Sequence, residues 1–92
     1  MTDSDKNNLR NRLLENLKLV EQEDKELIDS IRELEGERAA GTGLYGFAMG
    51  VISAWIELDL EYLGLLGKVN KNEVDFIKMS IAAEWSSLII NK

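Results

Sequence analysis

The chain of 92 residues contains no proline, and its seven glycines all lie between positions 36 and 67. Proline and glycine are the residues that most often interrupt regular secondary structure. Both ends of the chain are therefore suited to long helices, and breaks are expected near the glycines. We predict an all-α fold, in which a long N-terminal helix precedes an antiparallel helical hairpin within a single domain over residues 1–92.

The first helix is predicted over about residues 5–35, after capping residues at positions 2–4. Its apolar residues recur at alternating steps of four and three, the heptad spacing of a coiled coil, if Asp24 fills one position. There an aspartate either fixes the register of the seam or leaves a gap that faces water, and the gap is the simpler interpretation. We assign the seam to an interaction surface made of Leu13, Leu17, Val20, Asp24, Leu27, Ile31 and Leu34.

A glycine-rich linker at residues 36–43 precedes a second helix at about residues 44–66. Small and polar residues form one narrow stripe along this helix, and nearly all its other positions are apolar. A helix that is apolar around most of its girth is buried in a core or in a membrane. We expect the stripe to form a contact groove at Gly46, Gly50 and Ser53.

The third helix is predicted at about residues 71–90, after a turn at residues 67–70 and a capping-box pattern at Asn70 and Glu73. It carries two roughly opposite apolar faces: Val74, Ile77, Ile81, Trp85 and Leu88 on one, and Phe76, Met79, Ala83 and Ile90 on the other. A helix with two apolar faces contacts two neighbours. We expect a second copy to supply one of them in a homo-oligomeric bundle of three-helix protomers, and a compact monomer is the alternative.

The two tryptophans, Trp55 and Trp85, belong to the residue types that anchor protein interfaces. We therefore include both in the candidate interaction surface. Core packing is the other role open to them. For Trp55 it is favoured, because the neighbouring positions on the predicted helix are apolar.

The net charge is −6, and the excess of acidic side chains falls mainly within residues 21–37. Such a surface repels phosphate backbones, so we expect no nucleic-acid partner. It is compatible with a basic protein partner, although a solvated acidic helix face is the simpler interpretation. The chain has no cysteine and no histidine, so it lacks thiolate ligands, the commonest zinc ligand and the commonest general base. We expect no cofactor and no enzymatic activity.

A membrane-inserted protein is the second interpretation, because residues 39–56 are uncharged and just long enough for a membrane span. Glycines within this run, and acidic residues directly after it, weigh against insertion. The polar, acidic start of the chain does not resemble a signal peptide, and a cytoplasmic location is expected.

Two weaker patterns are typical of ligand-binding sites, one for a dinucleotide and one for a cation. Residues 41–46 fit Gly-x-Gly-x-x-Gly, but a charged helix rather than a strand precedes them, which argues against a dinucleotide site. Glu57 and Glu61 are spaced to share a cation on one helix face, and a metal-dependent helical enzyme is therefore the third interpretation. The sequence favours a non-catalytic interaction module: an adaptor, an inhibitor or a small regulatory subunit, of a size and acidity that fit a phage or mobile-element protein.

Overall fold

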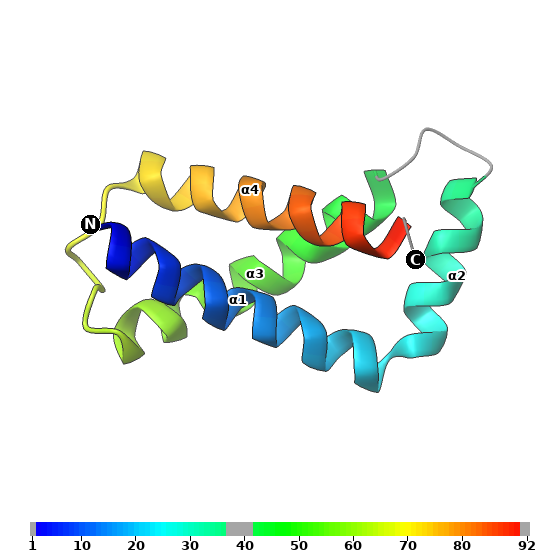
Figure 1. Ribbon diagram of the computed structural model, residues 1–92, viewed down its shortest axis with the longest axis horizontal. Helices are drawn as coiled ribbons and strands as arrows, with labels where there is room; N and C mark the ends of the chain where they lie inside the picture. Colours follow the sequence, from blue (N-terminus) through cyan, green and yellow to red (C-terminus); the bar gives the residue numbers. More distant parts are fainter. Residues whose placement is uncertain (1, 37–41, 91–92) are drawn as a thin grey trace.

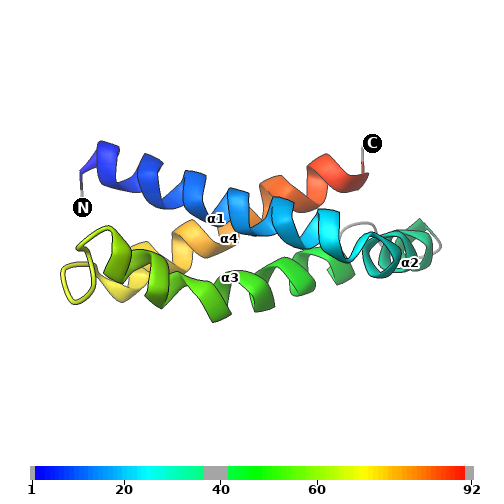
Figure 2. The same ribbon diagram turned by 90° about the horizontal axis from the view of Figure 1, so that it is seen from below.

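The computed structural model describes residues 2–36 and 42–90, and over these ranges the chain forms four helices and no strand. The helices are α1 (Asp3–Glu23), α2 (Lys25–Gly36), α3 (Thr42–Tyr62) and α4 (Lys71–Ile90). The all-α prediction is confirmed. Helices α1 and α4 run in the same direction, and α3 runs antiparallel to both (Figure 1). Helix α2 turns away from α1, packs against α3 and closes the end of the bundle where α1 and α4 end (Figures 1 and 2).

The N-terminal part of the chain forms two helices, so the prediction of one helix over residues 5–35 is wrong. The break falls at Asp24, whose φ of −116° and ψ of 42° lie outside the helical region. Its N–H still donates to the carbonyl oxygen of Val20 at 2.8 Å, and its own carbonyl accepts from the N–H of Ile28 at 3.1 Å. Asp24 therefore ends α1 and starts α2. It faces water, as the gap interpretation expects, and aspartate is a poor helix former because its side chain competes for backbone hydrogen bonds.

The break changes which apolar residue of α2 enters the core. Leu27, which the heptad pattern places in the seam, is 48% exposed, whereas the next residue, Ile28, is 3% exposed. The seam residues are therefore fully buried in the core of this chain only within α1. They divide into buried ones (Leu13, Leu17), half-buried ones (Val20, Ile31) and exposed ones (Asp24, Leu27), and the side chain of Leu34 lies outside the described part of the chain.

Helix α3 ends at Tyr62, earlier than the predicted position 66, because Gly64 closes it with a Schellman motif. The N–H of Gly64 donates to the carbonyl of Glu61 at 3.0 Å, and the N–H of Leu65 reaches back to the carbonyl of Leu60 at 2.8 Å. Gly64 has a φ of 72°, a left-handed conformation that glycine adopts without steric cost. The α3–α4 connection then places Asn70 at the start of α4, where its side-chain oxygen accepts from the N–H of Asn72 at 2.7 Å.

The core lies between α1, α3 and α4, with Ile28 of α2 added at one end. Two aromatic rings pack inside it: the ring centroids of Phe47 and Trp85 are 6.1 Å apart, with an angle of 29° between the planes. On α4 the core-facing residues are Ile77, Ile81, Trp85 and Ile89, while Leu88 is exposed. The second predicted face of α4 also points to solvent, since Phe76, Met79 and Ala83 are exposed. The side chain of Ile90 lies outside the described residues.

Candidate interaction surface

A buried carboxylate joins α1 to α3. Asp59 is 2% exposed, and its Oδ1 accepts from Arg12, whose Nε and Nη2 both lie 3.1 Å away. Its Oδ2 accepts from the Nδ2 of Asn16 at 2.9 Å. Burying a carboxylate is costly unless it is paired and hydrogen-bonded, and both conditions are met here. These contacts fix how α1 lies on α3.

The same arginine reaches the surface. The guanidinium carbon of Arg12 lies 3.8 Å from the centroid of the Tyr62 ring, which is a cation–π contact. Tyr62 is 73% exposed, so its ring is held at the surface by a side chain that is itself anchored on buried Asp59. The result is an aromatic ring that faces solvent and has an ordered neighbour.

Tyr62 belongs to an exposed apolar row on α3. Trp55, Leu58 and Tyr62 follow one another at steps of three and four residues, so they share one face of the helix. They are 47%, 56% and 73% exposed. The expectation that Trp55 packs in the core is therefore wrong, because the core-facing side of α3 is occupied by Ile52, Ile56, Asp59 and Leu60. We call Trp55, Leu58 and Tyr62 the α3 row.

The predicted groove at Gly46, Gly50 and Ser53 is also on the solvent side of α3. A Cβ atom added at either glycine would meet no heavy atom within 4 Å. Within the described residues, therefore, no helix of this chain approaches these glycines closely. The glycines leave an open strip on the solvent side of α3, in the turns that precede the α3 row.

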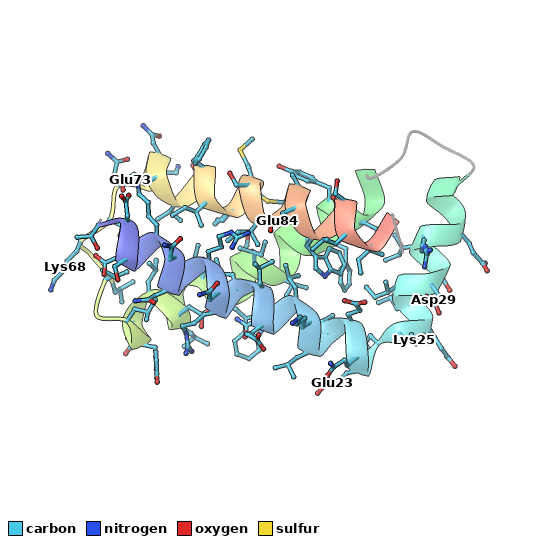
Figure 3. All side chains as sticks on the ribbon, viewed as in Figure 1. Glu23, Lys25, Asp29, Lys68, Glu73 and Glu84 are labelled. Carbon is cyan, nitrogen blue, oxygen red and sulfur yellow. The ribbon has the colours of Figure 1, made fainter. Side chains whose placement is uncertain are left out.

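Trp85, the other predicted anchor, is 3% exposed and is part of the core. It follows Glu84, which forms an ion pair with Arg10 of α1. Figure 3 shows Glu84 between α4 and α1. The acidic segment of the sequence lies at the corner between α1 and α2, where Glu23, Asp24, Glu26 and Asp29 are exposed.

Sequence reasoning missed Arg12, Asn16 and Asp59. A signal for Asp59 was present: on a helical projection it falls among the apolar positions of α3, far from the stripe that holds Glu57 and Glu61. An acidic residue on the apolar side of a helix needs a partner. Its two partners on α1 are four residues apart, the spacing that places Arg12 and Asn16 on one face.

Comparison with known proteins gives no match: no family model, no curated protein and no solved structure matches this chain. Within residues 2–36 and 42–90, no group of three or more acidic side chains is arranged to hold a metal ion. The segment Gly43–Tyr62 of α3 is long and apolar enough to cross a membrane, and 33% of its most apolar stretch is buried in the fold.

Proposed function

We propose that this protein is a non-catalytic interaction module, an adaptor, inhibitor or small regulatory subunit, which associates with a second copy of itself through the outer face of α3. The observation that carries the proposal is the α3 row. Tryptophan, tyrosine and arginine are the residues most enriched among those that dominate binding energy at protein interfaces. Here Trp55 and Tyr62 lie on one exposed helix face, with Arg12 stacked on the Tyr62 ring.

Ordering of side chains is one of the main costs of binding, and at Tyr62 the contact with Arg12 lowers this cost. Arg12 is fixed by its hydrogen bonds to Asp59, and the Tyr62 ring is fixed by Arg12. The row lies on a helix whose buried face packs in the core. An aromatic ring that is already held in position favours a stable contact.

A two-fold symmetric dimer fits this face, because the same surface can pair with itself. The open strip at Gly46 and Gly50 lies earlier on the solvent side of the same helix, and the absence of side chains there would let the backbone of a partner helix come close. The acidic corner between α1 and α2 lies on other elements, so it stays exposed in such a dimer. A basic protein is the partner chemistry that this corner supports, and the proposed setting is the cytoplasm.

The test is the absolute mass of the purified protein, measured by light scattering on a sizing column without detergent over a range of concentrations. We expect a dimer for the natural protein and a monomer for Leu58→Lys, which places a charge in the centre of the row. The matched control is Phe76→Lys, a lysine on the exposed face of α4, which should leave the dimer intact. A natural protein that is monomeric at every concentration would contradict self-association.

A membrane-associated form is the second candidate, because α3 is long and apolar enough to span a bilayer and a large part of it faces outward. Insertion would require Asp59 to leave Arg12 and would also bury Glu57 and Glu61, at a cost of several kcal/mol. Flotation with neutral phospholipid vesicles separates the two candidates. Protein that stays with the aqueous fraction as a dimer supports the interaction module, whereas protein that floats and requires detergent for purification supports the membrane form.

A further inference from the structure

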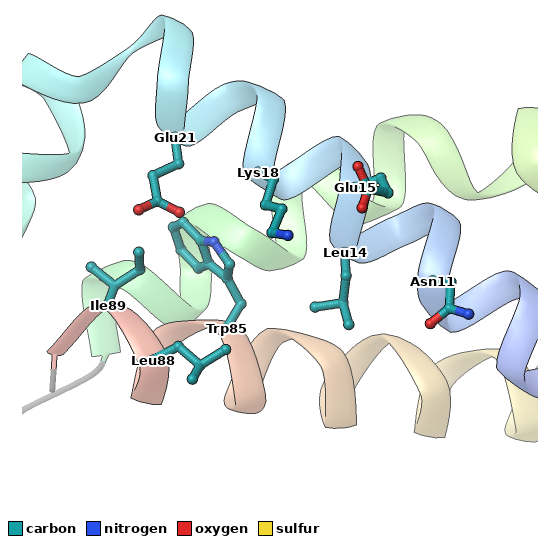
Figure 4. A pocket seen from close by; sticks show the side chains of 8 residues that line it. All are labelled: Asn11, Leu14, Glu15, Lys18, Glu21, Trp85, Leu88 and Ile89. Atoms are coloured by element: carbon teal, nitrogen blue, oxygen red, sulfur yellow. The ribbon is translucent and has the colours of Figure 1, made fainter. Parts of the chain in front are cut away.

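A groove of about 600 Å³ opens between α1 and α4. The two helices run in parallel and are joined by the ion pair of Arg10 with Glu84, beyond which they diverge (Figure 1). Every residue that lines the groove follows this pair along its own helix. Leu14 forms the apolar part of the α1 wall, and Trp85, Leu88 and Ile89 form the α4 wall (Figure 4).

One polar atom in the wall of this groove has no partner. The Nε1 of Trp85 is buried and makes no hydrogen bond to any atom of the described residues. Buried donors are paired in the great majority of cases, and an unpaired one costs about 1–3 kcal/mol. Figure 4 shows the nitrogen edge of the indole turned toward Lys18, which extends into the groove from α1. Lysine is flexible, so its movement can give a ligand access to this edge.

We propose that the groove binds an uncharged, apolar small molecule with one hydrogen-bond acceptor, a carbonyl or hydroxyl oxygen, to which Trp85 Nε1–H donates. The volume lies within the range of about 300–1,000 Å³ that is typical of small-molecule sites, and such sites combine apolar walls with few polar groups. The site shares no residue with the α3 row, so the proposal does not depend on self-association.

The charges around the groove select against anionic ligands. Glu15 and Glu21 line it together with Lys18, so its rim carries a net negative charge. An anion would meet that negative charge, and a cation would meet Lys18 beside the indole nitrogen. A neutral oxygen acceptor avoids both repulsions, and it supplies the hydrogen-bond partner that the Nε1–H of Trp85 lacks.

The test uses three probes of nearly the same shape: 2-acetylnaphthalene, which has a neutral carbonyl, 2-ethylnaphthalene, which has no acceptor, and 2-naphthoate, which is anionic. The readout is the indole Nε1–H resonance in a ¹⁵N–¹H NMR spectrum, which the variant Trp55→Phe assigns to Trp85. We expect the ketone to move the Trp85 resonance downfield and to bind about fivefold more tightly than the hydrocarbon, the value of one net hydrogen bond. The carboxylate should bind more weakly than the ketone.

Two variants distinguish binding in this groove from non-specific hydrophobic binding elsewhere on the protein. Trp85→Phe removes the reporting resonance, so binding to this variant is followed through the backbone amide resonances of Leu88 and Ile89. It should weaken binding of the ketone about fivefold and leave binding of the hydrocarbon unchanged, because it removes the donor and keeps an aromatic ring. Leu88 is exposed at the groove, and Leu88→Lys should weaken the binding of both the ketone and the hydrocarbon about tenfold or more. Met79→Lys, an exposed position of α4 outside the groove, should change neither.

Three results would overturn the proposal. The first is a Trp85 resonance that does not move at a saturating concentration of the ketone. The second is equal weakening of ketone and hydrocarbon by Trp85→Phe, which would assign the indole a purely structural role. The third is a shift of the Trp85 resonance when Leu58→Lys converts a dimer to monomers without any probe present, because a second copy would then occupy the groove.

Discussion

The guanidinium of Arg12 lies 3.8 Å from the centroid of the Tyr62 ring while its nitrogens donate to the buried carboxylate of Asp59. One side chain thus connects a polar contact inside the bundle to an aromatic residue on its surface. A change at Arg12 is therefore expected to affect both the packing of α1 on α3 and the proposed dimer. Such a double effect separates Arg12 from ordinary surface arginines.

Arg12→Lys should lower the free energy of unfolding by about 1 kcal/mol and should weaken the dimer, because lysine keeps the charge but loses the planar group that stacks on Tyr62. Arg10→Lys is the control. Arg10 pairs with Glu84 at a half-exposed position, where such pairs contribute about 0–1 kcal/mol. Urea unfolding measures the first effect and light scattering the second. Equal effects of the two substitutions would show that neither the stacking on Tyr62 nor the paired contact with Asp59 contributes beyond the charge of Arg12.

Asp59→Asn should destabilise the fold by about 1–3 kcal/mol, because the amide is neutral and directs one N–H₂ group at donors that need an acceptor. Glu57→Gln makes the same chemical change on the exposed side of α3. Its free energy of unfolding should stay within about 0.5 kcal/mol of that of the natural protein. The two variants are compared by thermal unfolding. If Glu57→Gln were the more harmful, the assignment of the core-facing side of α3 would be reversed.

Ile28→Ala should cost about 2–4 kcal/mol, because Ile28 is buried and its truncation leaves a cavity. Leu27→Ala, one position earlier, should cost less than about 1 kcal/mol in the monomer. This pair of neighbours tests the break at Asp24 directly. A continuous N-terminal helix with a heptad seam predicts the opposite order, with Leu27 the more sensitive residue.

Gly50→Ala should raise the stability of the monomer by about 1 kcal/mol, because alanine is the better helix former and an added Cβ meets no other atom. The same substitution should weaken the dimer if a partner helix approaches this strip. Gly64→Ala makes the same chemical change where φ is 72°, and should destabilise by about 1 kcal/mol. Unfolding curves below and above the dimerisation concentration separate the effects, and a dimer strengthened by Gly50→Ala would exclude the strip from the interface.

The sequence predicts α4 well because its start has an unambiguous local cause. Asn70 caps the helix, and the bounds that the pattern predicts are those that the structure has. The predicted end of α3 was late because the Schellman motif at Gly64 depends on one left-handed residue inside a run that is otherwise apolar and helix-compatible.

The break at Asp24 could not be read from periodicity. A heptad pattern tolerates one polar residue, so the same spacing fits a straight helix and a broken one. The position of the break depends on the helices that α2 packs against. Helix α2 closes the end of the bundle, and the break brings Ile28 rather than Leu27 into contact with the core. That information lies in α3 and α4, not in the segment itself.

The candidate sites were predicted only in part. Gly46, Gly50 and Ser53 are exposed, as a contact surface requires, but Trp55 of the α3 row was expected in the core. The polarity of a helix face predicts burial only when the number of neighbours is known, and α3 has covering helices on one side. The unpaired nitrogen of Trp85 has no sequence signal, because it depends on how far α1 and α4 diverge.

The ion pair of Arg10 with Glu84 joins residues that are 74 positions apart. During translation, α1 leaves the ribosome before α2 and α3, and α4 leaves after them. The buried leucines of α1 therefore lack their neighbours on α4 until α4 has been made. These leucines are Leu9, Leu13 and Leu17. The contacts of α1 with α4 can therefore form only after the two intervening helices have been made, and non-local contacts of this kind slow folding.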